Sequence, residues 1–69
     1  MSNNNNRVKR GQAAVKAYLE VYANGGSDLE NLTDLLIDLR HWAEFFEVNF
    51  EKASDYSANH YNTERSVDV

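Results

Sequence analysis

The fold is decided by one stretch, Leu29-Glu30-Asn31-Leu32-Thr33-Asp34-Leu35-Leu36-Ile37-Asp38-Leu39-Arg40-His41-Trp42-Ala43-Glu44-Phe45-Phe46. Apolar side chains recur in it at three- and four-residue steps, which is the spacing of one face of an α-helix. This face, called the leucine face below, consists of Leu29, Leu32, Leu35, Leu36, Leu39, Trp42, Ala43 and Phe46. We expect this helix to organise the fold and to direct the leucine face toward the core.

The residues before this stretch predict where one helix ends and the next begins. Asn24-Gly25-Gly26 should end an earlier helix, because glycine readily takes the left-handed conformation found after helix C-termini. Ser27-Asp28-Leu29-Glu30 has the spacing of a capping box and should start the central helix. The earlier helix should begin at about residue 8, because these apolar residues share one arc of a helical wheel: Val8, Val15, Tyr18, Leu19 and Tyr22.

A third helix is predicted over residues 50–65. Asn49 is a good N-cap, and apolar or small residues follow it at helical spacing at Phe50, Ala53, Ser57 and Tyr61. This face carries little aliphatic carbon, so we expect the third helix to dock on the leucine face rather than stand alone. The chain has no alternating apolar and polar run that would indicate strands.

These patterns predict an all-α fold, a small three-helix domain spanning residues 8–65. Residues 1–7, with four consecutive asparagines, are expected to be a disordered polar tail, and residues 66–69 a frayed C-terminus. A chain of 69 residues makes at most one domain, and its core is small. Association into a homodimer would help to stabilise it.

Composition narrows the classes of function. Eleven acidic and seven basic residues give a net charge of −4, which disfavours non-specific binding to phosphate backbones. A basic cluster of Arg7, Lys9 and Arg10 leaves open an alternative, a regulatory DNA-associated module that uses this N-terminal arm. The absence of cysteine excludes disulfides and cysteine-bearing zinc sites. The polar N-terminus and the lack of a long apolar run predict a cytoplasmic protein with no membrane contact.

The two histidines are the candidates for chemistry. Asp38 precedes His41 by three residues and Glu64 follows His60 by four, so a metal-binding helical bundle is a further alternative. On the helical wheel, however, His41 points away from the leucine face and His60 lies at the edge of its own. We therefore predict no metal site and no cofactor. The sequence also lacks a glycine-rich phosphate loop and a nucleophile motif, so we do not expect an enzyme.

A second apolar stripe lies on the back of the central helix. Ile37, His41 and Phe45 follow one another at four-residue steps, roughly opposite the leucine face, with Asp34 and Asp38 beside them. A solvated face would be polar throughout, so something should cover the stripe. Either the first helix covers it, which would make it core, or a second copy or a foreign partner does. With Tyr56, which lies off the face of its own helix, the predicted interaction residues are Asp34, Ile37, Asp38, His41, Phe45 and Tyr56.

Part of the chain resembles a known group of proteins. The residues concerned are Leu32-Thr33-Asp34-Leu35-Leu36-Ile37-Asp38-Leu39-Arg40-His41-Trp42, followed by Asn49-Phe50, Ala53, His60-Tyr61 and Glu64. They resemble short helical proteins of phages, plasmids and other mobile elements that carry a TDLLxDLxH stretch, a short turn of the kind HGLDF, and a terminal HYxxE. The resemblance covers roughly residues 29–64. Glu47 stands where the related turn usually has glycine, so the geometry after the central helix should be strained or different.

The resemblance implies a small helical accessory protein and no particular reaction. Together with the acidic and aromatic surface, it favours a non-enzymatic phage or mobile-element protein that acts by binding a host or viral protein in the host cytoplasm. Inhibition of a host defence protein or of a nucleic-acid-binding protein would be one natural use of the negative charge.

Overall fold

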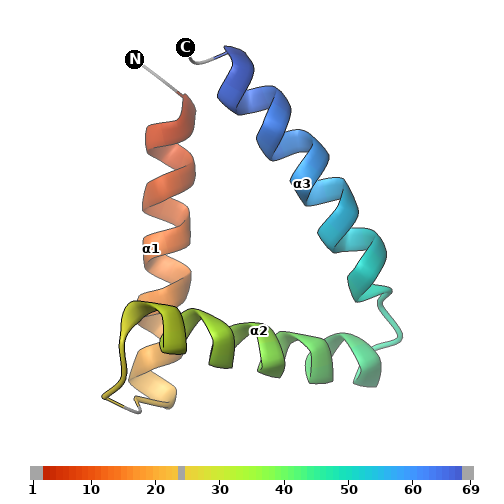
Figure 1. Ribbon diagram of the computed structural model, residues 1–69. Coiled ribbons are helices and arrows are strands. Elements are labelled where there is room, and N and C mark those ends of the chain that lie inside the picture. Colours follow the sequence, from red (N-terminus) through yellow and green to blue (C-terminus); the bar gives the residue numbers. More distant parts are fainter. Residues whose placement is uncertain (1–2, 24, 68–69) are drawn as a thin grey trace.

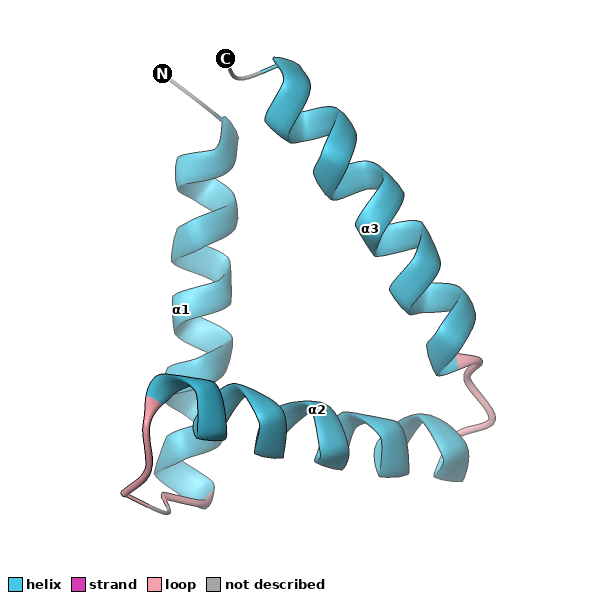
Figure 2. Ribbon diagram, in the orientation of Figure 1, coloured by secondary structure: helices cyan, strands magenta, loops and turns pink. Residues whose placement is uncertain are grey.

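The computed structural model of the chain describes residues 3–23 and 25–67, and these residues form three α-helices (Figures 1 and 2). The helices are α1 at Asn3–Val21, α2 at Asp28–Phe45 and α3 at Phe50–Val67. No strand occurs among the residues that are described. The prediction of a small all-α, three-helix domain is confirmed.

Two helix boundaries extend beyond the predicted ones. α1 begins at Asn3, so most of the tail predicted to be disordered is helical, and only residues 1–2 lie outside the described part. The Arg7 guanidinium holds this end of α1, because Nε and one terminal nitrogen donate to the two Glu64 carboxylate oxygens of α3 at 3.1 and 2.7 Å. α3 continues to Val67, and residues 68–69 of the predicted frayed end lie outside the described part.

The N-termini of α2 and α3 form as the sequence predicts. The Glu30 backbone N–H donates to Ser27 Oγ at 3.2 Å, and the Ser27 N–H donates to Glu30 Oε1 at 2.8 Å, which completes the capping box. The bond from the Ser27 backbone lowers the pKa of the Glu30 carboxyl, because it favours the charged form. At α3, the Lys52 N–H donates to Asn49 Oδ1 at 2.9 Å. Gly25, before α2, has the expected left-handed conformation, with φ of 73°.

The C-terminus of α2 closes in a Schellman motif built on a non-glycine residue. The Val48 N–H donates to the Ala43 carbonyl at 2.7 Å, and the Glu47 N–H donates to the Glu44 carbonyl at 3.2 Å. Glu47 has φ of 58°, in the left-handed region where glycine is usual. The strain predicted from the missing glycine is therefore confirmed, and Glu47 is the residue that bears it.

The three helices form the sides of an open triangle. α2 is its base, α1 crosses behind one end of α2, and α3 returns from the other end toward the start of α1 (Figure 1). The Cα extents are 35 × 28 × 16 Å, so the molecule is a thin plate. α1 meets α3 through Arg7 and Glu64, near the start of α1 and the end of α3, and it meets α2 where Tyr18 contacts Asp38.

The prediction that the leucine face forms the core is right for Ala43 and wrong for most of the large side chains of that face. Among the residues whose side chains are described, Ala43 is the one classed as buried, at 3% exposure, while Leu29 is 74% exposed and Leu36 41%. α3 also does not dock along this face as expected. The physical reason is composition: α1 and α3 carry few large aliphatic side chains, so they have too little apolar carbon to cover α2.

Candidate protein-binding surface

The chain's own helices do not enclose the apolar stripe on the back of α2. Ile37 is 48% exposed and Phe45 is 80% exposed, and His41 is exposed between them. Of the two predicted alternatives, core or interface, the stripe therefore does not form core. An apolar stripe this open is available to a partner.

The two aspartates predicted to belong to this surface lie toward α1. The Tyr18 hydroxyl donates to Asp38 Oδ2 at 2.5 Å, which joins the C-terminal half of α1 to the middle of α2. This bond, together with burial and the negative charges of Asp38 and Asp34, raises the pKa of Tyr18 to about 12. Asp38 therefore fastens two helices together, and Asp34 is half-buried beside them.

An exposed group of three aromatic rings lies at the C-terminal end of α2. The Trp42 and Phe46 ring centroids are 5.2 Å apart, and the Phe45 and Phe46 centroids 5.0 Å apart. Trp42 is 54% exposed and Phe46 57%. We call these three residues the aromatic cluster. Large rings already in mutual contact are the side chains that most often anchor protein interfaces.

Sequence reasoning placed Phe45 on this surface and missed Trp42 and Phe46. Both residues fit the period of the leucine face, and that period predicts a core position. The available signal was local: three rings within five residues, directly before a strained turn, are crowded at one helix end. Side chains at a helix end have fewer neighbours from their own chain to cover them.

Acidic groups dominate the charge near the aromatic cluster. Glu44 and Glu47 are adjacent to it in the chain. The nearby cation, Arg40, is engaged: it pairs with Glu51 at 2.5 Å, and its guanidinium lies 4.4 Å from the centre of the Phe50 ring. The cluster is thus an apolar surface with two carboxylates beside it in the sequence.

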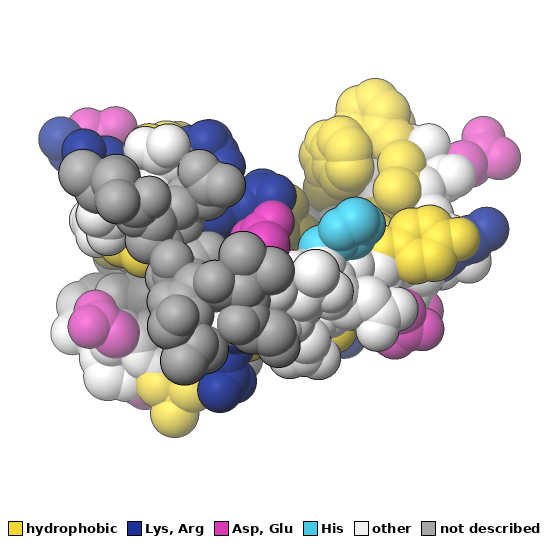
Figure 3. Space-filling view, turned by 90° about the horizontal axis from the view of Figure 1, so that it is seen from above, with side chains coloured by type: hydrophobic (Ala, Val, Ile, Leu, Met, Phe, Trp, Pro, Cys, Tyr) yellow, Lys and Arg dark blue, Asp and Glu magenta, His cyan; other side chains and the backbone are white. Residues whose placement is uncertain are grey.

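Tyr56 of α3 is exposed as expected, at 56%. Lys52 Nζ lies 5.7 Å from the centre of its ring, within the range of a cation–π contact. Figure 3 shows hydrophobic side chains gathered at the upper right of the molecular surface and basic side chains gathered at the left. On this face, the exposed hydrophobic side chains are therefore separated from much of the positive charge.

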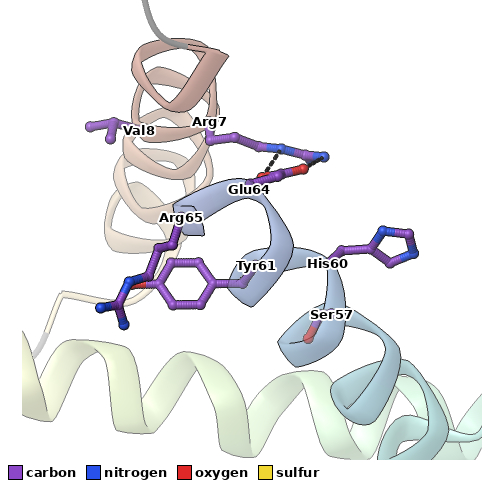
Figure 4. Close-up of a pocket in the computed structure, with 7 residues that line it drawn as sticks. All are labelled: Arg7, Val8, Ser57, His60, Tyr61, Glu64 and Arg65. Atoms are coloured by element: carbon purple, nitrogen blue, oxygen red, sulfur yellow. Dashed lines mark hydrogen bonds and ion pairs between the residues drawn. The ribbon is translucent and has the colours of Figure 1, made fainter. Parts of the chain in front are cut away.

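A pocket lies between the start of α1 and the end of α3 (Figure 4). The Arg7–Glu64 ion pair forms one wall, and Arg65 lies over the Tyr61 ring at 5.7 Å. His60 points away from Arg65, to the other side of α3. Because Glu64 neutralises Arg7, the basic arm of the DNA-binding alternative contributes less free charge than its sequence suggests.

The described ionisable groups form no metal-binding cluster. Within the described part of the chain, no three or more histidine, aspartate or glutamate side chains are placed to hold a metal ion. No described helix combines the length and the apolar character that crossing a membrane requires.

No protein-family model, curated protein or solved structure matches the chain.

Proposed function

We propose that this chain is a non-enzymatic binding protein that attaches to another protein through the aromatic cluster and the Ile37, His41 and Phe45 stripe of α2. The observation that carries the proposal is the 80% exposure of Phe45 in contact with a second exposed ring. Burying a phenylalanine side chain is worth about 1.5–3 kcal/mol. A partner that covers Phe45 therefore gains this contribution to the free energy of binding, because the side chain is exposed in the free chain.

The chemistry of the surface defines the partner. The aromatic cluster fits an apolar pocket, and the negative charge of the chain, with Glu44 and Glu47 next to the cluster in the sequence, favours a partner with basic residues near that pocket. A host or viral protein that binds nucleic acid has such a basic surface. Occupation of that surface by an acidic chain would exclude nucleic acid from it. This is the action we assign to the chain, as an inhibitory accessory protein of a phage or mobile element in the host cytoplasm.

The test begins with capture of the partner. The immobilised chain is exposed to a lysate of the native host, and bound proteins are identified by mass spectrometry and then titrated individually against the purified chain. Phe45→Glu should weaken the affinity at least about 30-fold, which corresponds to the loss of one interface hot spot. Raising the salt concentration should weaken the wild-type complex, because salt screens the attraction between the carboxylates of this chain and the basic residues of its partner.

Val21→Glu is the matched control, because Val21 is 88% exposed and lies on α1, away from the aromatic cluster. This variant should bind as tightly as the wild-type chain. Both variants should keep the wild-type helical circular dichroism signal, since neither side chain is buried. Equal binding by Phe45→Glu and the wild type would exclude the aromatic cluster as the binding surface.

A further inference from the structure

The free chain exposes more surface than its mass requires. Its accessible surface is 6023 Å². A compact monomer of 7.9 kDa exposes about 4,400 Å². The difference of about 1,600 Å² is surface that a chain of this size normally covers.

Part of the exposed surface is a regular seam on α2. Leu29, Leu32, Leu36 and Leu39 follow one another at steps of three, four and three residues, the a and d spacing of a coiled coil. Their exposures are 74%, 48%, 41% and 40%. We call these four residues the leucine seam. A helix with such a seam is built to lie against another helix.

We propose that the leucine seam is covered by a second copy of this chain, with the two α2 helices antiparallel about a twofold axis. The steps of three, four and three read the same in both directions. Each leucine therefore meets a leucine: Leu29 meets the partner's Leu39, and Leu32 meets the partner's Leu36. This pairing is isologous, so it closes at two copies and does not propagate.

The covered area supports a second copy as the occupant. A second copy laid along α2 covers part of the excess of about 1,600 Å² on each chain, so twice that excess, about 3,200 Å², is the upper limit of the area that the pair buries and leaves room for a dimer interface of standard size. The single chain is also only 16 Å deep, so it has no second layer of helices to cover the leucine seam. A second copy supplies that layer.

The positions of the charges on α2 allow two α2 helices to pack against each other, although each chain carries a net charge of −4. At 100° per residue, Glu30, Asp34 and Asp38 lie on the side of α2 away from the leucine seam. The positions that flank the seam between its ends are Thr33 and Leu35, which are uncharged. Two copies therefore meet without placing carboxylates against each other.

The purified chain alone provides the test, so its outcome is separate from that of the capture experiment. Sedimentation equilibrium should give twice the chain mass of 7.9 kDa. Leu36→Glu should raise the dissociation constant at least about 100-fold, because a carboxylate would be buried in the seam. Val21→Glu is the control, since Val21 is 88% exposed on α1 and lies outside the leucine seam. It should dimerise like the wild type.

Cross-linking tests the antiparallel arrangement without relying on a destabilising charge. The chain has no cysteine, so Leu29→Cys and Leu39→Cys each introduce a single thiol. A short bismaleimide should join the two variants when they are mixed. Leu29→Cys alone should not react with itself, because its two thiols would be separated along the helices by about 15 Å.

Three results would overturn the proposal. They are a monomer at high concentration, an unchanged dimer in Leu36→Glu, and efficient cross-linking of Leu29→Cys with itself. The last result would indicate parallel helices.

Discussion

At the scale of single residues, the sequence predicts the helix caps because each cap depends on a few neighbours. Ser27, Glu30 and Asn49 make the hydrogen bonds that their spacing indicates. The turn after α2 is also a local feature, but there the residue does not suit the geometry. The turn requires a left-handed conformation, and a glutamate, Glu47, adopts it. The hydrogen bond from the Val48 N–H to the Ala43 carbonyl holds Glu47 in this conformation. In Schellman motifs the side chains at these two positions are commonly in apolar contact. Ala43 is the one buried side chain among those that the structure describes.

Replacement of Glu47 by glycine should therefore stabilise the protein. The left-handed conformation disfavours a residue with a Cβ by about 1 kcal/mol or more, and glycine removes that strain. We expect Glu47→Gly to raise the free energy of unfolding by about 1 kcal/mol in thermal unfolding followed by circular dichroism. Glu47→Ala removes the carboxylate and keeps the Cβ, so it should give little of this gain. Equal gains in both variants would indicate that charge, not backbone conformation, limits stability at the turn.

At the scale of elements, the existence of three helices follows from local periodicity, whereas their mutual tilt does not. The spacing of Tyr18 on α1 predicts an inward position, and Tyr18 is half-buried. Its partner, however, is the Asp38 carboxylate, which helical periodicity assigns to a solvated side of α2. A polar contact between helices sets where α1 crosses α2, and hydrophobic patterning carries no information about it. This is why the sequence placed Asp38 on an interaction surface.

The Tyr18 to Asp38 hydrogen bond should make stability depend on alkaline pH. Its formation raises the pKa of Tyr18 from 10.0 to about 12, so the folded state favours the protonated phenol. The resulting stabilisation is complete below pH 10 and is lost as the pH rises toward 12. Thermal unfolding over this pH window should show the loss, and phenolate absorbance should show the late titration.

Two variants check the cause of this behaviour. Asp38→Asn removes the charged acceptor, so it should return the pKa of Tyr18 toward 10.0 and flatten the alkaline dependence of stability. Asp34→Asn should have a smaller effect, because Asp34 acts on Tyr18 through its charge alone. An unchanged phenolate titration in Asp38→Asn would show that α1 and α2 do not meet through this bond.

At the scale of the whole molecule, the sequence does not distinguish a core face from an interface face. Leu29, Leu32, Leu36 and Leu39 have the spacing that either role requires, and periodicity reports only that something covers them. The same ambiguity assigned Trp42 to the core. What separates the two roles is the amount of apolar material that the other helices supply, and α1 and α3 supply little. The stripe at Ile37 and Phe45 shows the same ambiguity: the sequence leaves it either covered by the first helix or free for another molecule, and the structure leaves it exposed.

Amide hydrogen exchange across a range of protein concentrations measures most directly whether this chain covers its own leucines. We expect exchange in α2, residues 28–45, to be fast in dilute wild-type protein and to slow as the concentration rises, because a second copy then protects the helix. Leu36→Glu should remain fast throughout. Slow exchange in α2 at the lowest concentration, with no dependence on concentration, would contradict the account, since a single chain would then bury its leucine face by itself.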